Sequence, residues 1–203
     1  MMGKTHLVCG IASAMAFTKP DTPLKIVGAI TMGALGGLIS DTDLFSKHSH
    51  SNRLGQIISG IIIFLVALAI IDMIFSLGIF TYIFAHTGLF QVVGVIGFLV
   101  LSVLCMIAEH RKFSHSILAG LLLTLTVYMT CPAVALYFLV GFTSHIVLDL
   151  LNKRPIRLFF PIKKGVCFKL CHANGQANEA FFVVGLILAV LFTVIRIVSL
   201  FFV

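Results

Sequence analysis

Charged residues are scarce in this chain of 203 residues. Asp, Glu, Lys and Arg make up 10% of it, hydrophobic residues make up 60%, and the mean hydropathy is +1.14. A typical soluble domain has about 25% charged residues. A soluble fold of this length could not bury so much apolar surface, so part of the surrounding solvent must be lipid. The composition therefore predicts an integral membrane protein.

Acidic residues are the scarcest charged group, with 7 Asp and Glu against 14 Lys and Arg and a net charge of +7. In a soluble protein this excess would suggest a nucleic-acid partner. In a membrane protein, basic residues in short loops hold the orientation of the chain and contact anionic lipid. We therefore expect lipid partners and no nucleic acid.

The sequence also lacks internal repeats, low-complexity linkers and a recognisable signal peptide. The opening "MMGKTHLVCG" has neither a long apolar run nor a small-residue cleavage site. Residues 1–203 are therefore predicted to form a single membrane-embedded domain. The C-x3-C-H spacing of Cys167, Cys171 and His172 is only a weak zinc signal, because no second cysteine pair completes a tetrahedral set. The other three cysteines lie in apolar runs and are expected to pack as small hydrophobic residues.

Long apolar runs predict an all-α fold, a polytopic integral membrane helical bundle. The run 117–151 is too long for one membrane span, and Pro132 offers a break within it. The first two helices are shorter than the ~20 residues that cross a bilayer, so we expect them to be re-entrant or tilted. The expected helices span residues 5–17, 25–39, 56–85, 90–108, 117–131, 132–151 and 180–203.

Counting helices as alternate crossings places nearly all polar ionisable residues at one membrane face. Eleven of the 14 basic residues fall there as well. Because positive charge marks cytoplasmic loops, this face is predicted to be the cytoplasmic side of a bacterial inner membrane.

Three polar motifs interrupt or end the apolar runs. In "SDTD", Asp41 and Asp43 are spaced to share a cation, or are simply solvated acids. In "EHRKFSHS", two histidines bracket an arginine, an arrangement that suits a metal site or the binding of lipid headgroups. In "SHIVLD", His145 and Asp149 share one helix face, either as metal ligands or as a structural pair. His48 and His50 either add metal ligands or belong to a flexible loop, and Asp72 is not explained by these motifs.

The ordered motifs resemble the LexA-regulated, membrane-bound metal-dependent hydrolase family, the YdjM-like proteins. The resemblance runs from "KTH" through "GGLISDTD" and "HRKFSHS" to "GFTSHIVLDLL" and "RLFFPIK", over most of residues 4–165. Ser40 replaces a family proline, Leu44 stands where a histidine often follows, and Ser114 replaces a threonine. The resemblance implies a metal site formed by His6, Asp41, Asp43, His110, His115, His145 and Asp149.

A set of nitrogen and oxygen ligands of this kind suits one or two divalent ions, with zinc or manganese preferred. The resulting hypothesis is a membrane-bound metal-dependent hydrolase that cleaves an ester or phosphoester of a lipid-borne anionic substrate at the cytoplasmic face. Glu109 is the candidate general base, and Arg111 is the candidate anion clamp. The alternatives are a metal transporter or sensor and a non-catalytic membrane scaffold.

Overall fold

The structure is a computed structural model that describes residues 1–41, 88–107, 111–172 and 175–201. This part of the chain holds six α-helices and a short 3₁₀ helix, and its β-structure is limited to two isolated bridges. The all-α prediction is confirmed. The helices are α1 (Gly3–Thr18), α2 (Pro23–Ile39), α6 (Leu89–Ile107), η1 (Phe113–His115), α7 (Ile117–Thr130), α8 (Pro132–Leu150) and α9 (Gln176–Ser199).

Local sequence signals explain where several of these helices begin. The Thr22 side chain caps α2 by accepting a hydrogen bond from the backbone of Lys25, and Pro23 fills the first turn. Ser116 caps α7 in the same way through Ala119, at 3.1 Å. The predicted break at Pro132 is confirmed, since α7 ends at Thr130 and α8 begins at the proline.

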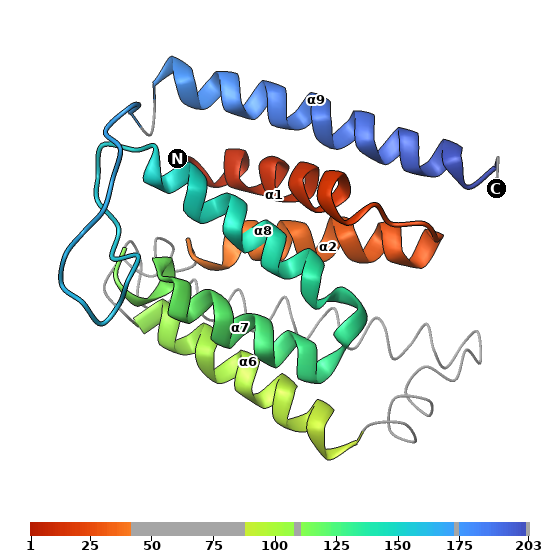
Figure 1. Ribbon diagram of the computed structural model, residues 1–203, viewed down its shortest axis with the longest axis horizontal. Helices are drawn as coiled ribbons and strands as arrows, with labels where there is room; N and C mark the ends of the chain where they lie inside the picture. Colours follow the sequence, from red (N-terminus) through yellow and green to blue (C-terminus); the bar gives the residue numbers. More distant parts are fainter. Residues whose placement is uncertain (42–87, 108–110, 173–174, 202–203) are drawn as a thin grey trace, which may run out of the picture.

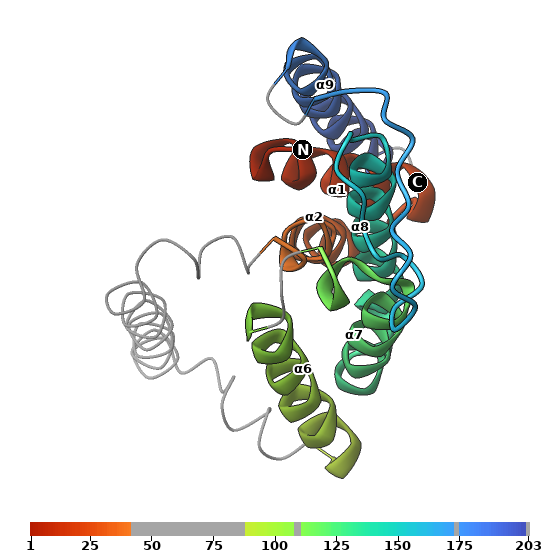
Figure 2. The ribbon, with the colours of Figure 1, turned by 90° about the vertical axis from the view of Figure 1, so that its left-hand side faces the viewer.

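The helices run roughly back and forth between two ends of the molecule (Figure 1). One end collects the start of α1, the ends of α2, α6 and α8, and the starts of α7 and α9. Helix α2 packs against α1 and α8, while α9 lies mainly on α1 and α6 mainly on α7 (Figure 2). Within the described residues, only α8 and α9 are long and apolar enough to cross a membrane, so a polytopic bundle is not established by helix length.

Glycines bring the backbones of α1, α2 and α8 into direct contact. A Cβ atom added at Gly10 or at Gly141 would collide with the carbonyl oxygen of Gly33, and one at Gly37 would lie 2.5 Å from the carbonyl oxygen of His6. Small residues permit such close helix packing in membranes. The glycine-rich α2 therefore sits as a thin layer between two helices that carry predicted site residues.

Residues 151–172 fold back over the end of the molecule where α8 finishes. Two bridges, Asn152 with Cys171 and Ile156 with Val166, tie this segment into a hairpin, which we call the basic hairpin (residues 152–171). The backbone nitrogen of Ile117 donates a hydrogen bond to the carbonyl of Leu158 at 3.0 Å. Through this contact the basic hairpin fixes the junction between η1 and α7.

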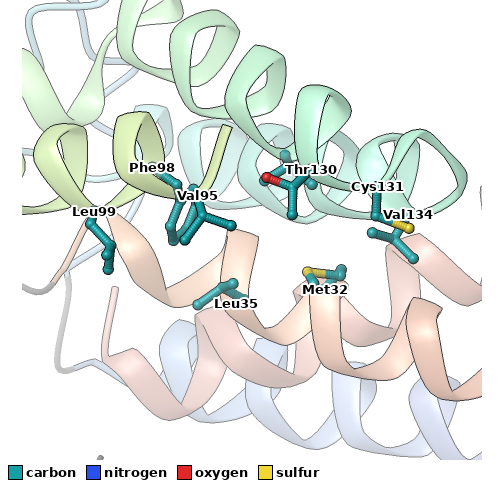
Figure 3. Close-up of a pocket in the computed structure, with 9 residues that line it drawn as sticks. Met32, Leu35, Val95, Phe98, Leu99, Thr130, Cys131 and Val134 are labelled. Atoms are coloured by element: carbon teal, nitrogen blue, oxygen red, sulfur yellow. The ribbon is translucent and has the colours of Figure 1, made fainter. Parts of the chain in front are cut away.

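An apolar cavity of about 150 Å³ lies between α2, α6 and the α7–α8 turn (Figure 3). Met32 and Leu35 line it from α2, and Phe98 lines it from α6. None of the predicted metal ligands among the described residues lines this cavity.

Candidate metal centre

Five of the seven predicted metal ligands converge at the end of the molecule covered by the basic hairpin. Their side chains come from four separate segments, and all five residues are buried, with exposed fractions between 0% and 5%. The five, which we call the His–Asp cluster, are His6, Asp41, His115, His145 and Asp149. Asp43 and His110 lie outside the described residues, as do Glu109, His48, His50 and Asp72.

Two carboxylates flank three imidazole rings in the His–Asp cluster. The Nε2 atoms of His6 and His115 each lie 3.3 Å from an oxygen of Asp149, and that of His145 lies 3.9 Å from the same carboxylate. The corresponding distances to Asp41 are 3.9, 3.6 and 3.8 Å. Every histidine therefore presents its Nε2 atom to both acids.

These distances fit a bound divalent ion. Ligand atoms about 2.0–2.1 Å from a tetrahedral zinc ion lie about 3.3–3.4 Å from one another. Two sets of three ligand atoms each fall within 4.8 Å of one another: His6, Asp41 and His145 in one, and His115, His145 and Asp149 in the other. In the described part of the chain, the Nε2 atoms of His6 and His145 and one oxygen of Asp41 have no hydrogen-bond partner despite being buried. Unsatisfied buried polar atoms are costly, and a shared cation would satisfy them together.

The close packing of α2 places His6 and His145 face to face. Their rings stack with centroids 3.9 Å apart and an interplanar angle of 27°. The carbonyl oxygen of Gly37 accepts a hydrogen bond from Nδ1 of His145 at 2.8 Å. Because Nδ1 carries the proton, Nε2 of the neutral ring has its lone pair facing the cluster.

His115 is oriented by its neighbour in η1. The hydroxyl of Ser114 lies 3.0 Å from Nδ1 of His115, and both residues are fully buried. Nε2, the other ring nitrogen, faces Asp149 and Asp41. Ser114 thus holds a hydroxyl against the ring.

The start of α1 is anchored to α9, and this anchoring positions His6. Asn178 is fully buried, and its Oδ1 atom accepts hydrogen bonds from the backbone of Met2 and the hydroxyl of Thr5, both at 3.0 Å. Lys4 forms an exposed ion pair with Glu179 at 3.0 Å. The polar side chains at the start of α9 were not identified as structural anchors from the sequence.

The carboxylate of Asp149 has the most polar contacts in the His–Asp cluster. Besides the histidines, its Oδ1 atom accepts a hydrogen bond from Nδ2 of Asn152 at 2.7 Å, and the Met1 amino nitrogen lies 2.6 Å from it. The guanidinium of Arg111 is 3.7 Å from Oδ2. Asn152 was not predicted from the sequence, although its position three residues after Asp149 brings it near the same helix face.

Arg111 lies beside the His–Asp cluster and has a left-handed backbone conformation, with φ of 64°. Its carbonyl accepts a hydrogen bond from the backbone of Arg157, and its Nη1 atom donates one to the carbonyl of Arg154 at 2.9 Å. These contacts hold the arginine between the basic hairpin and Asp149.

Asp41 and His115, the two members of the His–Asp cluster that lie outside the long helices, have shifted pKa values. Burial acts to raise the pKa of Asp41, but the neighbouring His115, His145 and His6 outweigh it and bring the value down to about 2. Burial acts to lower the pKa of His115, but the carboxylates of Asp149 and Asp41 raise it above its ordinary value. Asp41 is therefore ionised at neutral pH, and His115 holds its proton more strongly than a free histidine when no cation is bound.

Cys167, Cys171 and His172, whose spacing is the weak zinc signal in the sequence, make polar contacts in and beside the basic hairpin. The thiols of Cys167 and Cys171 contact the carbonyls of Lys153 and Leu151, and His172 pairs with the Lys153 side chain at 2.9 Å. These side chains help close the basic hairpin.

Comparison with known proteins identifies the family of the chain. No curated protein and no solved structure matches it significantly. The family model described as YdjM inner membrane protein matches residues 1–202, nearly the whole chain, and includes every residue of the His–Asp cluster. The chain therefore belongs to the YdjM inner membrane protein family.

Proposed function

We propose that this chain is a multi-pass inner membrane protein whose His–Asp cluster binds a divalent metal ion and hydrolyses an ester or phosphoester of a lipid-borne substrate at the cytoplasmic face. The observation that carries the proposal is the convergence of three imidazoles and two carboxylates, with N···O distances of 3.3–3.9 Å, in a buried site.

Three nitrogen and two oxygen ligands suit zinc or manganese. His6, His115 and His145 would supply the nitrogens, and Asp41 and Asp149 would supply the oxygens. A divalent ion provides Lewis acidity and makes water nucleophilic near neutral pH. The protein residues themselves fix the position of the site and exclude bulk water from it, since every member is at least 95% buried.

The basic character of the surrounding surface supports an anionic substrate. Arg111 lies at the edge of the His–Asp cluster, where its partly exposed guanidinium can pair with a phosphate or carboxylate. The basic hairpin adds exposed cations, namely Lys153, Arg154, Lys163, Lys164 and Lys169. Glu109 remains the proposed general base.

Exposed apolar side chains of the basic hairpin support a substrate that stays in the lipid. Phe159, Ile162, Phe168 and Leu170 are 54–71% exposed and alternate with the basic residues. Segments that combine exposed apolar and basic side chains bind the headgroup region of anionic membranes. This arrangement supports a position of the hairpin, and with it Arg111, at the level of lipid headgroups.

The helix arrangement supports the proposed topology. Exposed Leu, Val and Ile side chains cover α6 and α9, as expected for helices that face lipid. The start of α1, residues 111–112 and the basic hairpin, which carry basic residues, lie at the end with the cluster. The end of α1, the start of α2 and the end of α9 lie at the other end (Figure 1), and their basic residues are Lys19, Lys25 and Arg196. By the positive-inside rule, this distribution supports a cytoplasmic location of the cluster. A location at the helix ends also disfavours transport, because transport sites usually lie near the bilayer midplane.

The proposal is tested by metal analysis followed by a hydrolysis assay. The purified protein in detergent is expected to contain zinc or manganese in stoichiometric amount, and Asp41→Ala and His115→Ala are expected to lose it. His172→Ala is the matched control, since this histidine lies at the same end but pairs with Lys153. The metal-loaded protein is then assayed for phosphate or fatty-acid release from anionic phospholipid vesicles.

The outcomes separate the candidate functions. Wild-type protein without stoichiometric metal, unchanged by the two substitutions, would refute the metal site. Bound metal with no hydrolysis of any phosphoester or carboxylic ester lipid would leave a non-catalytic scaffold in which the ion holds the helices together.

A further inference from the structure

Asn152 lies two residues after the end of α8 and contacts Asp149, the acid with the most polar contacts in the cluster. Its side chain is 1% exposed, and its Nδ2 atom donates a hydrogen bond to Oδ1 of Asp149 at 2.7 Å. Its backbone nitrogen also donates to the carbonyl of Asp149 at 3.2 Å. Because an ionised carboxylate only accepts hydrogen bonds, the amide NH₂ group of Asn152 must face Asp149.

The amide of Asn152 contacts one of the two carboxylate oxygens, and both oxygens face histidines of the cluster. Oδ1 of Asp149 receives the amide and also lies 3.3 Å from Nε2 of His6 and 2.6 Å from the Met1 amino nitrogen. Oδ2 faces Nε2 of His115 at 3.3 Å and Nε2 of His145 at 3.9 Å. Rotation of the carboxylate about its terminal bond would break the amide hydrogen bond. The bond therefore selects one orientation of Asp149.

Asn152 is itself held in place by the basic hairpin. It forms a parallel bridge with Cys171, and the backbone of Lys153 donates to the carbonyl of Cys171 at 3.1 Å. The backbone of Cys171 in turn donates to the carbonyl of Leu151 at 3.1 Å. The amide therefore approaches Asp149 from a backbone that is fixed on both sides.

The other half of the amide argues against a role limited to stability. Within the described residues, Oδ1 of Asn152 is buried and has no hydrogen-bond partner. A buried unsatisfied acceptor costs about 1–3 kcal/mol. An apolar residue would avoid this cost, but it could not orient Asp149.

We propose that Asn152 is a positioning residue that fixes the Asp149 carboxylate for metal binding. This inference rests on the proposed function, since it assigns a role toward the same ion. Residues that hydrogen-bond to metal ligands orient them, and their substitution commonly reduces metal affinity about 10–100-fold.

The test compares Asn152→Ala with wild-type protein in detergent. Zinc and manganese affinities are measured separately by competition with a chelating dye, and thermal unfolding is measured on the metal-free proteins. Asn152→Ala is expected to weaken metal affinity about 10–100-fold. Asn152→Ser is the second variant, in case the alanine variant does not fold. It removes less volume, but its hydroxyl is one bond too short to reach Asp149, so the same loss is expected.

Met15→Ala is the control for general loosening. Met15 is fully buried near the end of α1 and packs in a core with Ile26, Ala29 and Tyr137, away from the start of α1 that carries His6. It should lower thermal stability while leaving metal affinity within about twofold of wild type.

Each outcome bears on the inference. Equal metal affinity of wild type and the Asn152 variants would overturn it and leave the metal site intact. Equal weakening by Asn152→Ala and Met15→Ala would also overturn it, because general loosening would then explain both. Wild-type protein that binds neither metal would refute the proposed function together with this inference.

Discussion

Gly37 supports two histidines at once, because a Cβ atom here would lie 2.5 Å from the carbonyl oxygen of His6, and its own carbonyl accepts the Nδ1 proton of His145. The residue thus sets both the spacing of α1 from α2 and the ring orientation in α8. Only glycine allows α1 and α2 to approach this closely at position 37.

We expect Gly37→Ala to separate α1 from α2 and abolish metal binding. Overpacking of this kind typically costs about 1–3 kcal/mol. Metal content and thermal unfolding in detergent measure both effects. Gly3→Ala is the control, since its added Cβ would meet Leu38 at an ordinary 3.8 Å. Normal metal content in Gly37→Ala would contradict this prediction.

Metal binding should strengthen as the pH rises. His115 must be neutral to bind a cation, and in the metal-free protein its pKa is raised by Asp149 and Asp41. Its proton therefore competes with the metal up to a pH above its ordinary value of 6.5. Asp41, with a pKa of about 2, stays ionised throughout this range.

The same shift has the opposite effect on the metal-free protein. A raised folded-state pKa of His115 stabilises the fold below the unfolded value, and this contribution is lost as the pH rises through the folded value. The thermal shift caused by added zinc should therefore increase from pH 6 to pH 8. A shift that is constant or falls over this interval would argue against His115 as a ligand.

Arg111→Ala should impair turnover without removing the metal. The guanidinium is 3.7 Å from Asp149 but is not among the candidate ligands. Loss of a charge-assisted contact to an anionic substrate is worth about 1.5–3 kcal/mol, or about 10–100-fold in kcat/KM. Lys25→Ala at the opposite end is the control. Arg111→Lys should recover little of the lost kcat/KM, because lysine cannot make the bidentate contact.

Two of the polar contacts between α1 and α9 should differ in their contribution to stability. Asn178 is buried, so Asn178→Ala removes the side-chain acceptor of both the Thr5 hydroxyl and the Met2 backbone and should cost about 1–3 kcal/mol. The Lys4–Glu179 pair is about half exposed, so Glu179→Ala should change stability by less than about 1 kcal/mol. Denaturant titration of both variants measures the difference, and equal effects would refute it.

Native cysteines can report the membrane orientation. Cys131 is exposed at the α7–α8 turn, whereas Cys167 lies in the basic hairpin at the opposite end (Figure 1). In single-cysteine variants, a membrane-impermeant maleimide should label Cys131 once the outer membrane is opened. It should label Cys167 only after the inner membrane is also permeabilised. The reverse pattern would place the His–Asp cluster on the periplasmic side.

Much of the fold could be predicted from the sequence because its signals are local. Apolar runs, Pro132 and the glycines of α2 each act on neighbouring residues or on backbone packing, and the described helices match the expected ones within a few residues. The expected helix 56–85 lies outside the described residues. The gathering of His6, Asp41, His145 and Asp149 at one end followed from counting helix crossings.

The contacts that refine the cluster could not be predicted in the same way. The hydrogen bonds of Asn152 to Asp149 and of His145 to Gly37 depend on side-chain rotamers and on the close approach of helices. An asparagine shortly after a helix is also typical of an ordinary helix C-terminus. Asn178 anchors α1 across a long separation in the chain, and periodicity carries no information about such a contact.

The placement of His145 and Asp149 on α8 has a consequence for biogenesis. In the proposed topology, this helix enters the bilayer carrying two ionisable side chains, which makes its insertion alone unfavourable. Their partners His6 and Asp41 are synthesised earlier, on α1 and at the end of α2. The side chains that pair with His145 and Asp149 are therefore already present when α8 leaves the ribosome. A variant that lacks both His6 and Asp41 should therefore accumulate in the membrane to a lower level than wild type, as measured by immunoblotting.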